Sequence, residues 1–471
     1  MKYPLGAGWV RDQLALRVSP ANVRRVQPDG EFVLYWMQAT QRLDENWALR
    51  FAILEADRLG RPLLIHHEPL PSAPYACDRF LLFELQGARE IAREAARRGL
   101  PYQLVLPRAL GAPEAVVALA ERALLVVTDR FPTAGVAERT ARVAESAPCR
   151  VVAVDSAGIV PAASFPREEY AARTIRPKLA KLLDFSLAEV EEQPPARELP
   201  ASTWDSLDVE RLPVASLDDD ALRAEVARCD VDHDVAPVAC AGGVIAARAR
   251  LDAFLHDGLA GYAERRRHPD DEEGSSRLSP WLHHGQIAPA EVARAVRAHG
   301  PAGEAAAFLD EMVTWRELAL NCCTRNPRFA SLAALPDWVH QTMRRHAGDR
   351  REPRYTLRQL ERGETHDALW NAGQRELRAT GRMHNVVRML WGKSVLTWAP
   401  TYGDALRWLV HLNDRWALDG RDPSSYAGIL WCFGKFDRPF AERPVWGTIR
   451  PMSLERARVK YDVKGYIARW S

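Results

Sequence analysis

Short apolar runs alternate with segments that carry apolar residues at helical spacing over the first 185 residues. Stretches such as DENWALRFAILEADRLG have the pattern of amphipathic helices. The runs between them are rich in Val, Ile and Leu, as buried strands are: EFVLYW (31–36), PLLIHH (62–67), YQLVL (102–106), LLVVTD (124–129) and RVVAVD (150–155). The alternation predicts a Rossmann-like α/β domain, a parallel sheet with helices on both faces. No G-x-G-x-x-G follows the first run, which disfavours an ordinary nicotinamide-binding role.

The pattern changes near residue 186. Residues 186–240 are acidic and rich in Pro and Ala, which predicts a long connection across the surface. After about residue 241 the strand-like runs end, and Ala, Leu and Arg recur at helical spacing between breaks at Pro and Gly. We therefore predict an α/β domain over residues 20–185, an interdomain linker over 186–240 and an all-α domain over 241–471.

Composition narrows the class of protein. The 471 residues suffice for two or three domains, each with its own core. No apolar run approaches the ~20 residues of a membrane span, and the N-terminus lacks a signal-peptide core. The seven cysteines are scattered without a C-x-x-C pair, so neither a disulfide framework nor a metal site is expected. We expect a cytoplasmic protein that does not bind membranes.

The net charge of +2 is unevenly divided along the chain. Residues 241–471 hold 35 Lys and Arg against 27 Asp and Glu, whereas residues 1–240 hold 29 against 35. Eleven of the 15 tryptophans lie from residue 281 onward. A basic half rich in tryptophan is typical of a surface that binds a polyanion, although an ordinary solvated surface explains the charge as well.

One stretch of this half has the pattern of a phosphate site. In GSSRLSPWLHH, the hydroxyl residues Ser275, Ser276 and Ser279 lie at the start of a Pro-initiated helix. Backbone N–H groups at such a position suit a phosphate or pyrophosphate. A helix N-cap with a turn explains the same pattern without any ligand.

A carboxylate and an indole are paired in DEMVTWREL. Glu311 and Trp315 are four residues apart, so they share one face of a helix. If they line a pocket, the pair can hydrogen-bond and stack a base-like group. The alternative is a surface glutamate beside a core tryptophan.

Tryptophans form a stripe on the helix predicted in GRMHNVVRMLWGKSVLTW. Trp391 and Trp398 are seven residues apart, about 10 Å of helical rise. Trp370, in the preceding helical segment, could fall between them. An aromatic stripe at this spacing is most often core packing, and the other interpretation is a path for an electron.

Two further patterns concern charged residues. Arg388 lies among apolar positions of the same helix, where a buried guanidinium needs a carboxylate partner, and Asp419 is a candidate. Near the C-terminus, basic and aromatic residues interleave, among them Arg438, Arg443 and Arg450. Such a pattern suits phosphates and displaced bases, or a solvated surface.

Taken together, these stretches resemble the DNA photolyase/cryptochrome superfamily, and specifically the class II cyclobutane pyrimidine dimer (CPD) photolyases. The matching segments occur in family order from about residue 31 to the end: YWMQATQRLDENWALRFA, SRLSPWLHHGQI, ALWNAGQREL, MHNVVRMLWGKSVLTW, LNDRWALDGRDPSSYAGILW and FDRPFAERPVWGTIRPMS. The resemblance implies a monomeric carbon–carbon lyase that splits CPDs in UV-damaged DNA, single or double stranded, with the energy of light. It implies an N-terminal antenna domain and a helical domain that holds FAD. A second chromophore of the deazaflavin or folate type in the antenna domain is left open.

The resemblance also assigns residues to the cofactor. The positions that match the family's FAD contacts are Tyr262, Ser275, Ser276, Arg277, Leu278, Ser279, Asn385, Arg388 and Asp419. Asn413 matches an asparagine near the flavin N5, where it would tune the protonation and redox state of the ring. Class II members commonly carry Gly and Tyr where this chain has Asn385 and Leu390.

The residues assigned to the substrate follow in the same way. Glu311 would hydrogen-bond a carbonyl of the dimer as charge develops, and the extruded dimer would contact Trp315, Met389 and Trp431. The arginines at 438, 443 and 450 would contact DNA. Trp391, Trp370 and Trp398 match a chain that carries an electron to the flavin, with Trp391 nearest to the ring.

Two other functions remain as alternatives. A cryptochrome-like photoreceptor would use the same flavin and tryptophans without repair, although it has no need for the dimer pocket predicted around Glu311. A plain DNA-binding protein with a basic helical domain would carry no chromophore.

Overall fold

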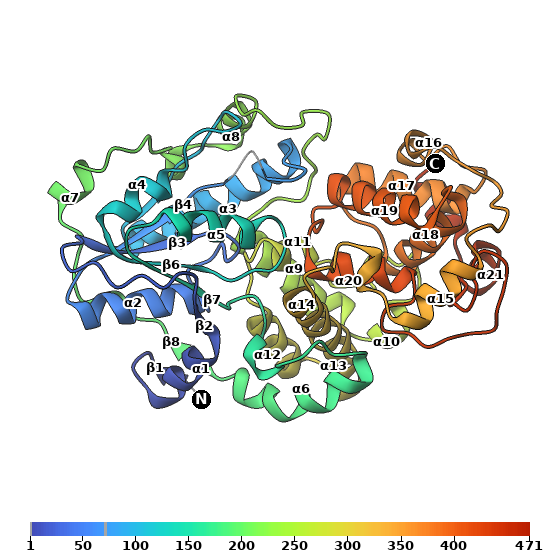
Figure 1. Cartoon of the computed structure of the whole chain (residues 1–471), viewed down its shortest axis with the longest axis horizontal. Helices are drawn as coiled ribbons and strands as arrows, with labels where there is room; N and C mark the ends of the chain where they lie inside the picture. The colour runs from blue at the N-terminus through green and yellow to red at the C-terminus, as the bar shows by residue number, and fades with distance from the viewer. Residues whose placement is uncertain (1, 70–72) are drawn as a thin grey trace. The chain divides into compact units, whose positions relative to one another are not determined.

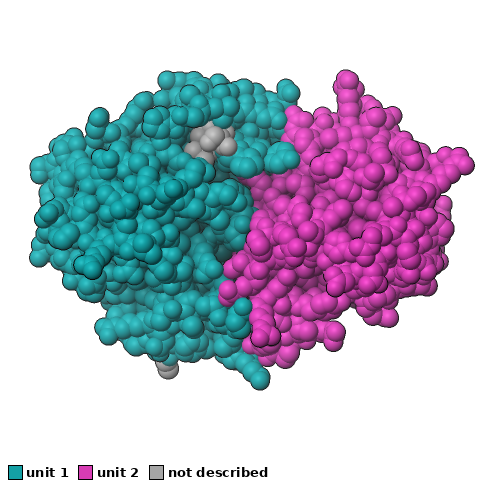
Figure 2. All heavy atoms as spheres, viewed as in Figure 1, with its two compact units in different colours: residues 1–166, 180–251, 278–295 teal, residues 167–179, 252–277, 296–471 magenta. Residues whose placement is uncertain are grey.

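The computed structural model describes residues 2–69 and 73–471 and divides the chain into two compact units (Figures 1 and 2). Unit 1 comprises residues 1–166, 180–251 and 278–295. Unit 2 comprises residues 167–179, 252–277 and 296–471. The boundaries predicted from the sequence, 20–185, 186–240 and 241–471, divide the chain by expected function, and this division stays a prediction.

A six-stranded sheet forms the centre of unit 1, in the order β2-β7-β6-β3-β4-β5. All neighbours are parallel except the edge strand β2, which runs antiparallel to β7. The predicted parallel α/β sheet is thereby confirmed. The strands are β2 (Val18–Pro20), β3 (Phe32–Met37), β4 (Leu63–His67), β5 (Tyr102–Leu104), β6 (Ala123–Asp129) and β7 (Arg150–Val154), while β1 (Lys2–Pro4) pairs with β8 (Glu189–Glu191) in a separate parallel ladder.

Helices cover both faces of this sheet because its central strands are apolar on both faces. Successive side chains of a strand point to opposite faces. Val33 and Tyr35 of β3 therefore pack in a core with α1 (Gly8–Arg17), α2 (Trp47–Leu59) and part of α3 (Asp78–Arg97). Leu34 and Trp36 pack on the other face, against α4 (Ala115–Arg122) and α5 (Val136–Ser146). In Figure 1, α2 and α4 lie on opposite sides of the strands.

The segment predicted as a connection, residues 186–240, contains short elements and lies within unit 1. They are β8, α7 (Ala201–Asp205), the 3-10 turn η2 (Val214–Ser216) and α8 (Asp219–Val226). Leu212, Val214, Leu222 and Val226 pack with Leu81, Leu82 and Leu85 of α3.

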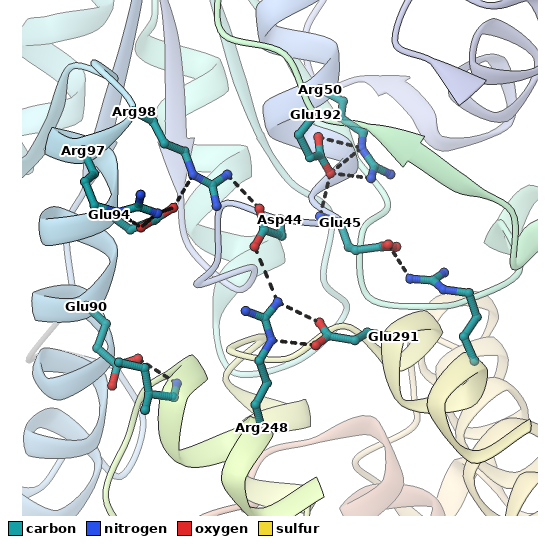
Figure 3. A network of polar contacts seen from close by, with 12 residues as sticks. Asp44, Glu45, Arg50, Glu90, Glu94, Arg97, Arg98, Glu192, Arg248 and Glu291 are labelled. Carbon is teal, nitrogen blue, oxygen red and sulfur yellow. Dashed lines mark hydrogen bonds and ion pairs between the residues drawn. The ribbon is translucent and has the colours of Figure 1, made fainter. Parts of the chain in front are cut away.

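A network of ion pairs joins several elements of unit 1 (Figure 3). Arg98, just after α3, pairs with Asp44 at 2.7 Å, and Arg248 of α9 (Val244–Ala253) pairs with Glu291 of α12 (Pro289–His299) at 2.6 Å. Arg248 also lies 3.5 Å from Asp44 and so links the two pairs. A cavity of about 800 Å³ lies against the network, with Leu43, Leu49, Ile53, Leu100 and Val190 among its apolar lining.

The described residues of unit 2 contain helices and no strand, which confirms the predicted helical C-terminal half. Two segments of unit 2 are π-helical, η3 (Phe254–Gly258) and η4 (Asp310–Trp315). The other elements are α10 (Tyr262–Arg265), α13 (Ala302–Leu309), α14 (Arg316–Arg325), η5 (Leu332–Ala334), α15 (Asp337–Arg345), α16 (Leu357–Arg362), α17 (Ala368–Thr380), α18 (Asn385–Trp398), α19 (Tyr402–Trp416), α20 (Pro423–Cys432), α21 (Leu454–Lys460) and α22 (Lys464–Arg469). Three elements complete the chain: η1 (Ala162–Ser164), α6 (Ala172–Ser186) and α11 (Ser279–His283).

Local signals fix the helices that carry the predicted site. The Asp367 side chain caps α17 by accepting a hydrogen bond from the backbone N–H of Trp370. Gly381 ends α17 in the left-handed conformation, where a side chain would be strained. Asp422 caps α20 in the same way, and Pro423 occupies its first helical position. These signals place α17, α18 and α20 where their apolar faces can pack together.

Two expectations about absence can be compared with the described part of the chain. Among residues 2–69 and 73–471, no helix is both long and apolar enough to cross a membrane. Over the same residues no group of three His, Cys, Asp or Glu side chains could hold a metal ion.

Candidate functional site

A largely buried polar cluster joins Arg388 of α18, Asn413 of α19 and Asp419, which follows α19. The guanidinium of Arg388 donates to both carboxylate oxygens of Asp419, at 3.1 and 2.9 Å, and to the amide oxygen of Asn413. Asn413 is 1 % exposed and Asp419 8 %. The pairing of Arg388 with Asp419 that the sequence suggested is thus confirmed. Its role toward a flavin stays a prediction.

Asp414 completes this cluster and was not predicted. The amide of Asn413 donates to Asp414 at 2.8 Å, and the hydroxyl of Tyr426 donates to the second carboxylate oxygen at 3.1 Å. Burial raises the pKa of Asp414, although these hydrogen bonds act in the opposite direction. Asp414 fixes which way the Asn413 amide points. Asp414 follows Asn413 directly in the sequence. A motif that includes both residues could have indicated it.

The three predicted tryptophans are in contact. The Trp370 and Trp391 rings stack with centroids 6.2 Å apart and planes 13° from parallel, and Trp398 meets Trp370 at 5.5 Å, tilted by 62°. Trp370 therefore lies between the other two, as the sequence analysis considered for a residue of the preceding helix. All three are buried, so they are core residues, and their role as an electron path stays a prediction.

Hydrogen bonds orient these indoles. The Trp391 N–H donates to the side-chain oxygen of Gln374 at 3.0 Å, and the Trp370 N–H donates to the backbone oxygen of Trp391 at 3.1 Å. Gln374 was not predicted. It lies one helical turn after Trp370 on α17, and this spacing is the signal that could have found it. A buried polar group with a fixed partner holds the ring of Trp391 in one orientation.

Glu311 and Trp315 both lie on the π-helical turn η4. Turns of this kind occur frequently at functional sites. The Glu311 carboxylate pairs with Arg266 at 2.8 Å, and Trp315 is 37 % exposed, so its ring is accessible for stacking. Burial raises the pKa of Glu311, and the Arg266 guanidinium partly offsets this. Arg266 was not predicted, and nothing in the pattern of the chain indicated that it would meet Glu311.

The raised pKa of Glu311 predicts a pH-dependent cost to stability. The folded protein holds the Glu311 proton to higher pH than the unfolded chain does, so stability falls as pH rises above about 4.5. We expect Glu311→Gln to unfold at a higher urea concentration than the wild type at pH 7.5, with the difference vanishing near pH 4. Urea unfolding at both pH values tests this.

Glu364 provides the control for that measurement because more than half of its side chain is exposed. Glu364→Gln should leave the urea midpoint nearly unchanged at both pH values, because an exposed ion pair contributes little to stability. A Glu311→Gln variant that is less stable than the wild type at pH 7.5 would contradict the expected gain in stability.

The predicted cofactor residues of the GSSRLS stretch lie where the chain passes from unit 2 to unit 1. Ser275, Ser276 and Arg277 are the last residues of a unit 2 segment, and Leu278 and Ser279 are the first of a unit 1 segment. Arg277 adopts the left-handed conformation, with φ of 55°, and its side chain lies 3.3 Å from Glu272 and 3.4 Å from Glu273. The residues from Ser276 to Leu278 have no regular secondary structure.

The remaining predicted cofactor residues have different surroundings. Tyr262 is buried, and its ring meets Phe254 at 5.8 Å and Phe308 at 5.3 Å, both edge-on. Burial raises the pKa of this phenol, which therefore stays protonated. Asn385 is exposed at the first position of α18. The described contacts thus do not join Tyr262 and Asn385 to the Arg388 cluster.

Trp431, predicted to flank the substrate, is in contact with two cations. The ammonium of Lys393 is 4.7 Å from the Trp431 ring centroid, and the guanidinium of Arg450 is 5.8 Å from it. Lys393 is fully buried on α18, and burial lowers its pKa to about 8. It was not predicted, although a lysine inside the apolar run LWGKSVL is a visible signal. Two cation–π contacts help to hold the Trp431 ring in place.

The other substrate residues lie on or near the same helices. Met389 is half-buried on α18, and its methyl group would contact a Cβ added at Gly428 of α20. Arg438, Arg443 and Arg450 are exposed in the segment between α20 and α21. The guanidinium groups of Arg438 and Arg450 lie 5.1 and 5.0 Å from the Phe440 ring. This interleaving of cations and rings is the one predicted from the sequence.

Comparison with known proteins gives close relatives over nearly the whole chain. A family model described as DNA photolyase matches residues 33–200. A deoxyribodipyrimidine photo-lyase of Methanothermobacter thermautotrophicus is 36 % identical over 451 residues, 95 % of this chain and 97 % of the relative. A protein of the same name from Oryza sativa subsp. japonica is 36 % identical over 471 residues, 95 % of this chain and 90 % of the relative.

Solved structures share the fold at lower identity. A cryptochrome of Synechocystis sp. PCC6803 superposes with a TM-score of 0.67 at 17 % identity, covering 93 % of this chain and 88 % of its own. An archaeal photolyase from Sulfolobus tokodaii, solved with two FAD molecules, superposes with a TM-score of 0.63 at 19 % identity, covering 93 % of this chain and 89 % of its own. Since both repair enzymes and a cryptochrome share this fold, the fold does not by itself decide between them.

Proposed function

This chain belongs to the DNA photolyase family, and we infer that it is a deoxyribodipyrimidine photo-lyase, an enzyme of light-dependent DNA repair. The observation that carries the inference is the match to relatives of that name at 36 % identity over 95 % of the chain. The cryptochrome neighbour is only 17 % identical, so it supports the fold and not a sensory function.

The residues of unit 2 fit an FAD cofactor by their chemistry. A flavin presents ring nitrogens and carbonyl oxygens, and the cluster of Arg388, Asn413 and Asp419 supplies a guanidinium, an amide and a carboxylate in one buried place. The FAD phosphates need hydroxyl and N–H donors, which Ser275, Ser276 and the following irregular segment carry. When bound in its reduced form, FAD supplies the light-driven electron that opens the cyclobutane ring.

We propose a CPD as the lesion and assign Glu311 to its carbonyl oxygen. Burial raises the pKa of Glu311, which favours the protonated carboxyl group as the donor of a hydrogen bond to that oxygen as negative charge develops there. The Arg266 guanidinium lies 2.8 Å from Oε1 of Glu311 and would hold the carboxyl group in position. Trp315, Met389 and Trp431 would enclose the flipped dimer and exclude water from it.

The exposed arginines would bind the DNA around the lesion. Arg438, Arg443 and Arg450 can each neutralise a phosphate, whichever base is attached, so they would bind single- and double-stranded DNA. A monomeric state and a cytoplasmic location are part of the same proposal.

The tryptophans would return the cofactor to its active form. Trp391 would give an electron to photoexcited oxidised FAD, Trp370 would replace that electron, and Trp398 would replace it in turn. The contacts at 6.2 and 5.5 Å between ring centroids support short steps along this path. Repair itself would involve no net redox change.

A second chromophore in unit 1 is also proposed, of the deazaflavin or folate type. The cavity of about 800 Å³ beside the ion-pair network has the size of a ligand site, and its lining of apolar and charged side chains suits a flat heterocycle that carries polar groups. The Sulfolobus tokodaii photolyase, solved with two FAD molecules, gives a precedent for a second chromophore in a protein of the same fold.

The repair reaction itself is the test of this proposal. Purified protein with reduced FAD should remove CPDs from UV-irradiated DNA in blue light and not in darkness. Glu311→Ala should lower the yield of repair per absorbed photon by about 100-fold, the usual cost of losing one group that stabilises developing charge. Glu317→Ala, on the neighbouring helix, serves as the control. Equal loss of CPDs in light and darkness would refute the assignment, and a coloured protein without repair would favour a photoreceptor.

A further inference from the structure

A second cavity lies in unit 2, beside Trp398, the last tryptophan of the proposed electron path. Its volume is about 450 Å³, within the range of small-molecule sites. Trp398 lines it together with Ser394 and Thr397 of α18, while Trp446 and Ser453 line it from the segment that leads into α21. The cavity belongs to neither the Arg388 cluster nor the Glu311 site.

The cavity gives access to an indole that is otherwise covered. Trp398 is 6 % exposed, because Trp370, Tyr355 and His366 pack against it at 5.5, 5.3 and 5.5 Å. Trp370 lies toward the interior, and the Tyr355 hydroxyl is engaged with His366 at 2.6 Å. A molecule that reacts with the Trp398 ring must therefore come close to it, and the cavity offers such a place.

The lining favours a polar molecule without negative charge. The described residues around the cavity include three carboxylates, from Glu352, Asp367 and Glu455, against one arginine, Arg458. Arg458 is paired with Asp367, and Glu352 is paired with Arg350, which lies outside the lining. Hydroxyl groups of Ser394, Thr397 and Ser453 provide further polar contacts. An excess of carboxylates in a lining repels anions and leaves uncharged molecules unaffected.

We propose that this cavity binds a small uncharged thiol that reduces oxidised Trp398. The inference rests on the proposed role of the tryptophans, since an electron taken from Trp398 must be replaced from outside the chain. Trp398 first loses one electron to oxidised Trp370 and its indole proton to water, and the neutral radical then takes one electron and one proton from the donor. The S–H bond breaks, the indole N–H bond forms again, and the donor leaves as a thiyl radical.

Laser-flash spectroscopy of the FAD-loaded protein tests this with dithiothreitol as the probe. The decay rate of the tryptophan radical should rise with dithiothreitol concentration and then saturate, because binding precedes the reaction. Thr397→Met narrows the cavity and should raise the half-saturating concentration about tenfold, the effect of losing one good contact. A rate that rises linearly without saturation and is equal in Thr397→Met would overturn the proposal.

Two control variants separate the cavity from its surroundings. Thr380→Met makes the same change at the last residue of α17, outside the cavity, and should leave the saturation curve unchanged. Tyr355→Phe keeps the ring against Trp398 and removes the hydroxyl, and saturation should persist. Loss of saturation in Tyr355→Phe would assign the reaction to the phenol and overturn the proposal. A flash that forms no tryptophan radical would refute the proposed electron path as well, which distinguishes the two failures.

The charge of the lining gives an independent readout in the dark. The fluorescence of Trp398, taken as the difference between the wild type and Trp398→Phe, should be quenched by uncharged acrylamide and hardly by iodide. Glu455→Gln should increase iodide quenching about twofold, because one repelling charge is removed, while Glu364→Gln, outside the lining, should not. Equal quenching by acrylamide and iodide in the wild type would overturn the preference for an uncharged donor.

Discussion

Replacement of Trp391 by phenylalanine should slow the photoreduction of oxidised FAD by at least about 100-fold. Phenylalanine fills most of the same space but is much harder to oxidise than an indole, and each ~1.4 kcal/mol added to a barrier slows the step about tenfold. The ring also loses its hydrogen bond to Gln374, which orients Trp391 against Trp370. Steady illumination in the presence of dithiothreitol, followed by flavin absorbance, measures the rate.

The same variant should keep its repair activity when the cofactor is reduced chemically beforehand. In the proposed mechanism Trp391 restores the reduced cofactor and does not touch the dimer. Trp416→Phe is the matched control, since the Trp416 indole is also buried and donates a hydrogen bond, to Glu361 at 3.0 Å. Unchanged photoreduction in Trp391→Phe, or an equal loss in Trp416→Phe, would show that the role given to Trp391 is wrong.

The second large effect is expected at Arg388. Arg388→Met should lower the free energy of unfolding of the cofactor-free protein by about 3–5 kcal/mol, the cost of breaking a buried ion pair from one side. The Asp419 carboxylate stays in a largely buried place without its guanidinium, and Asn413 loses a donor to its amide oxygen. Urea denaturation followed by tryptophan fluorescence measures the change.

The cofactor should respond to the same substitution. Arg388→Met protein should retain little FAD after gel filtration, because the guanidinium is the cation of the proposed flavin site. Arg407→Met supplies the control: Arg407 pairs with Asp404 on the surface of α19, with 71 % of its side chain exposed. Such a pair contributes about 0.5 kcal/mol or less. If both variants lost the same stability and FAD content, the Arg388 cluster would have no special role.

The fold could be predicted well from local pattern. The runs around residues 31–36, 62–67 and 124–129 are apolar on both faces, and this property requires a sheet covered on both sides. The antiparallel edge strand β2 was not foreseen, because three residues, Val18–Pro20, are too few to show any periodicity. Residues 186–240 have the composition of a connection, yet Leu212, Val214, Leu222 and Val226 pack against α3.

The candidate site could likewise be predicted only in part from the sequence. Helical periodicity placed Trp391 and Trp398 on one stripe, and charge chemistry required a partner for Arg388, so these features followed from the sequence. The contacts of Glu311 with Arg266 and of Trp391 with Gln374 did not follow, since partners 45 and 17 residues apart meet only when separate helices pack. The burial that raises the pKa of Glu311 arises in the same way.

The sequence by itself determined the two kinds of architecture, the helix faces and the family of this protein, because these depend on residue type and spacing along the chain. Only the tertiary structure decided which polar groups meet, which are buried and where a cavity remains. The approach of Trp370 to Trp398 and the cavity beside them depend on how α17, α18 and the segment before α21 fill space together. Spacing along one helix contains no information about that volume.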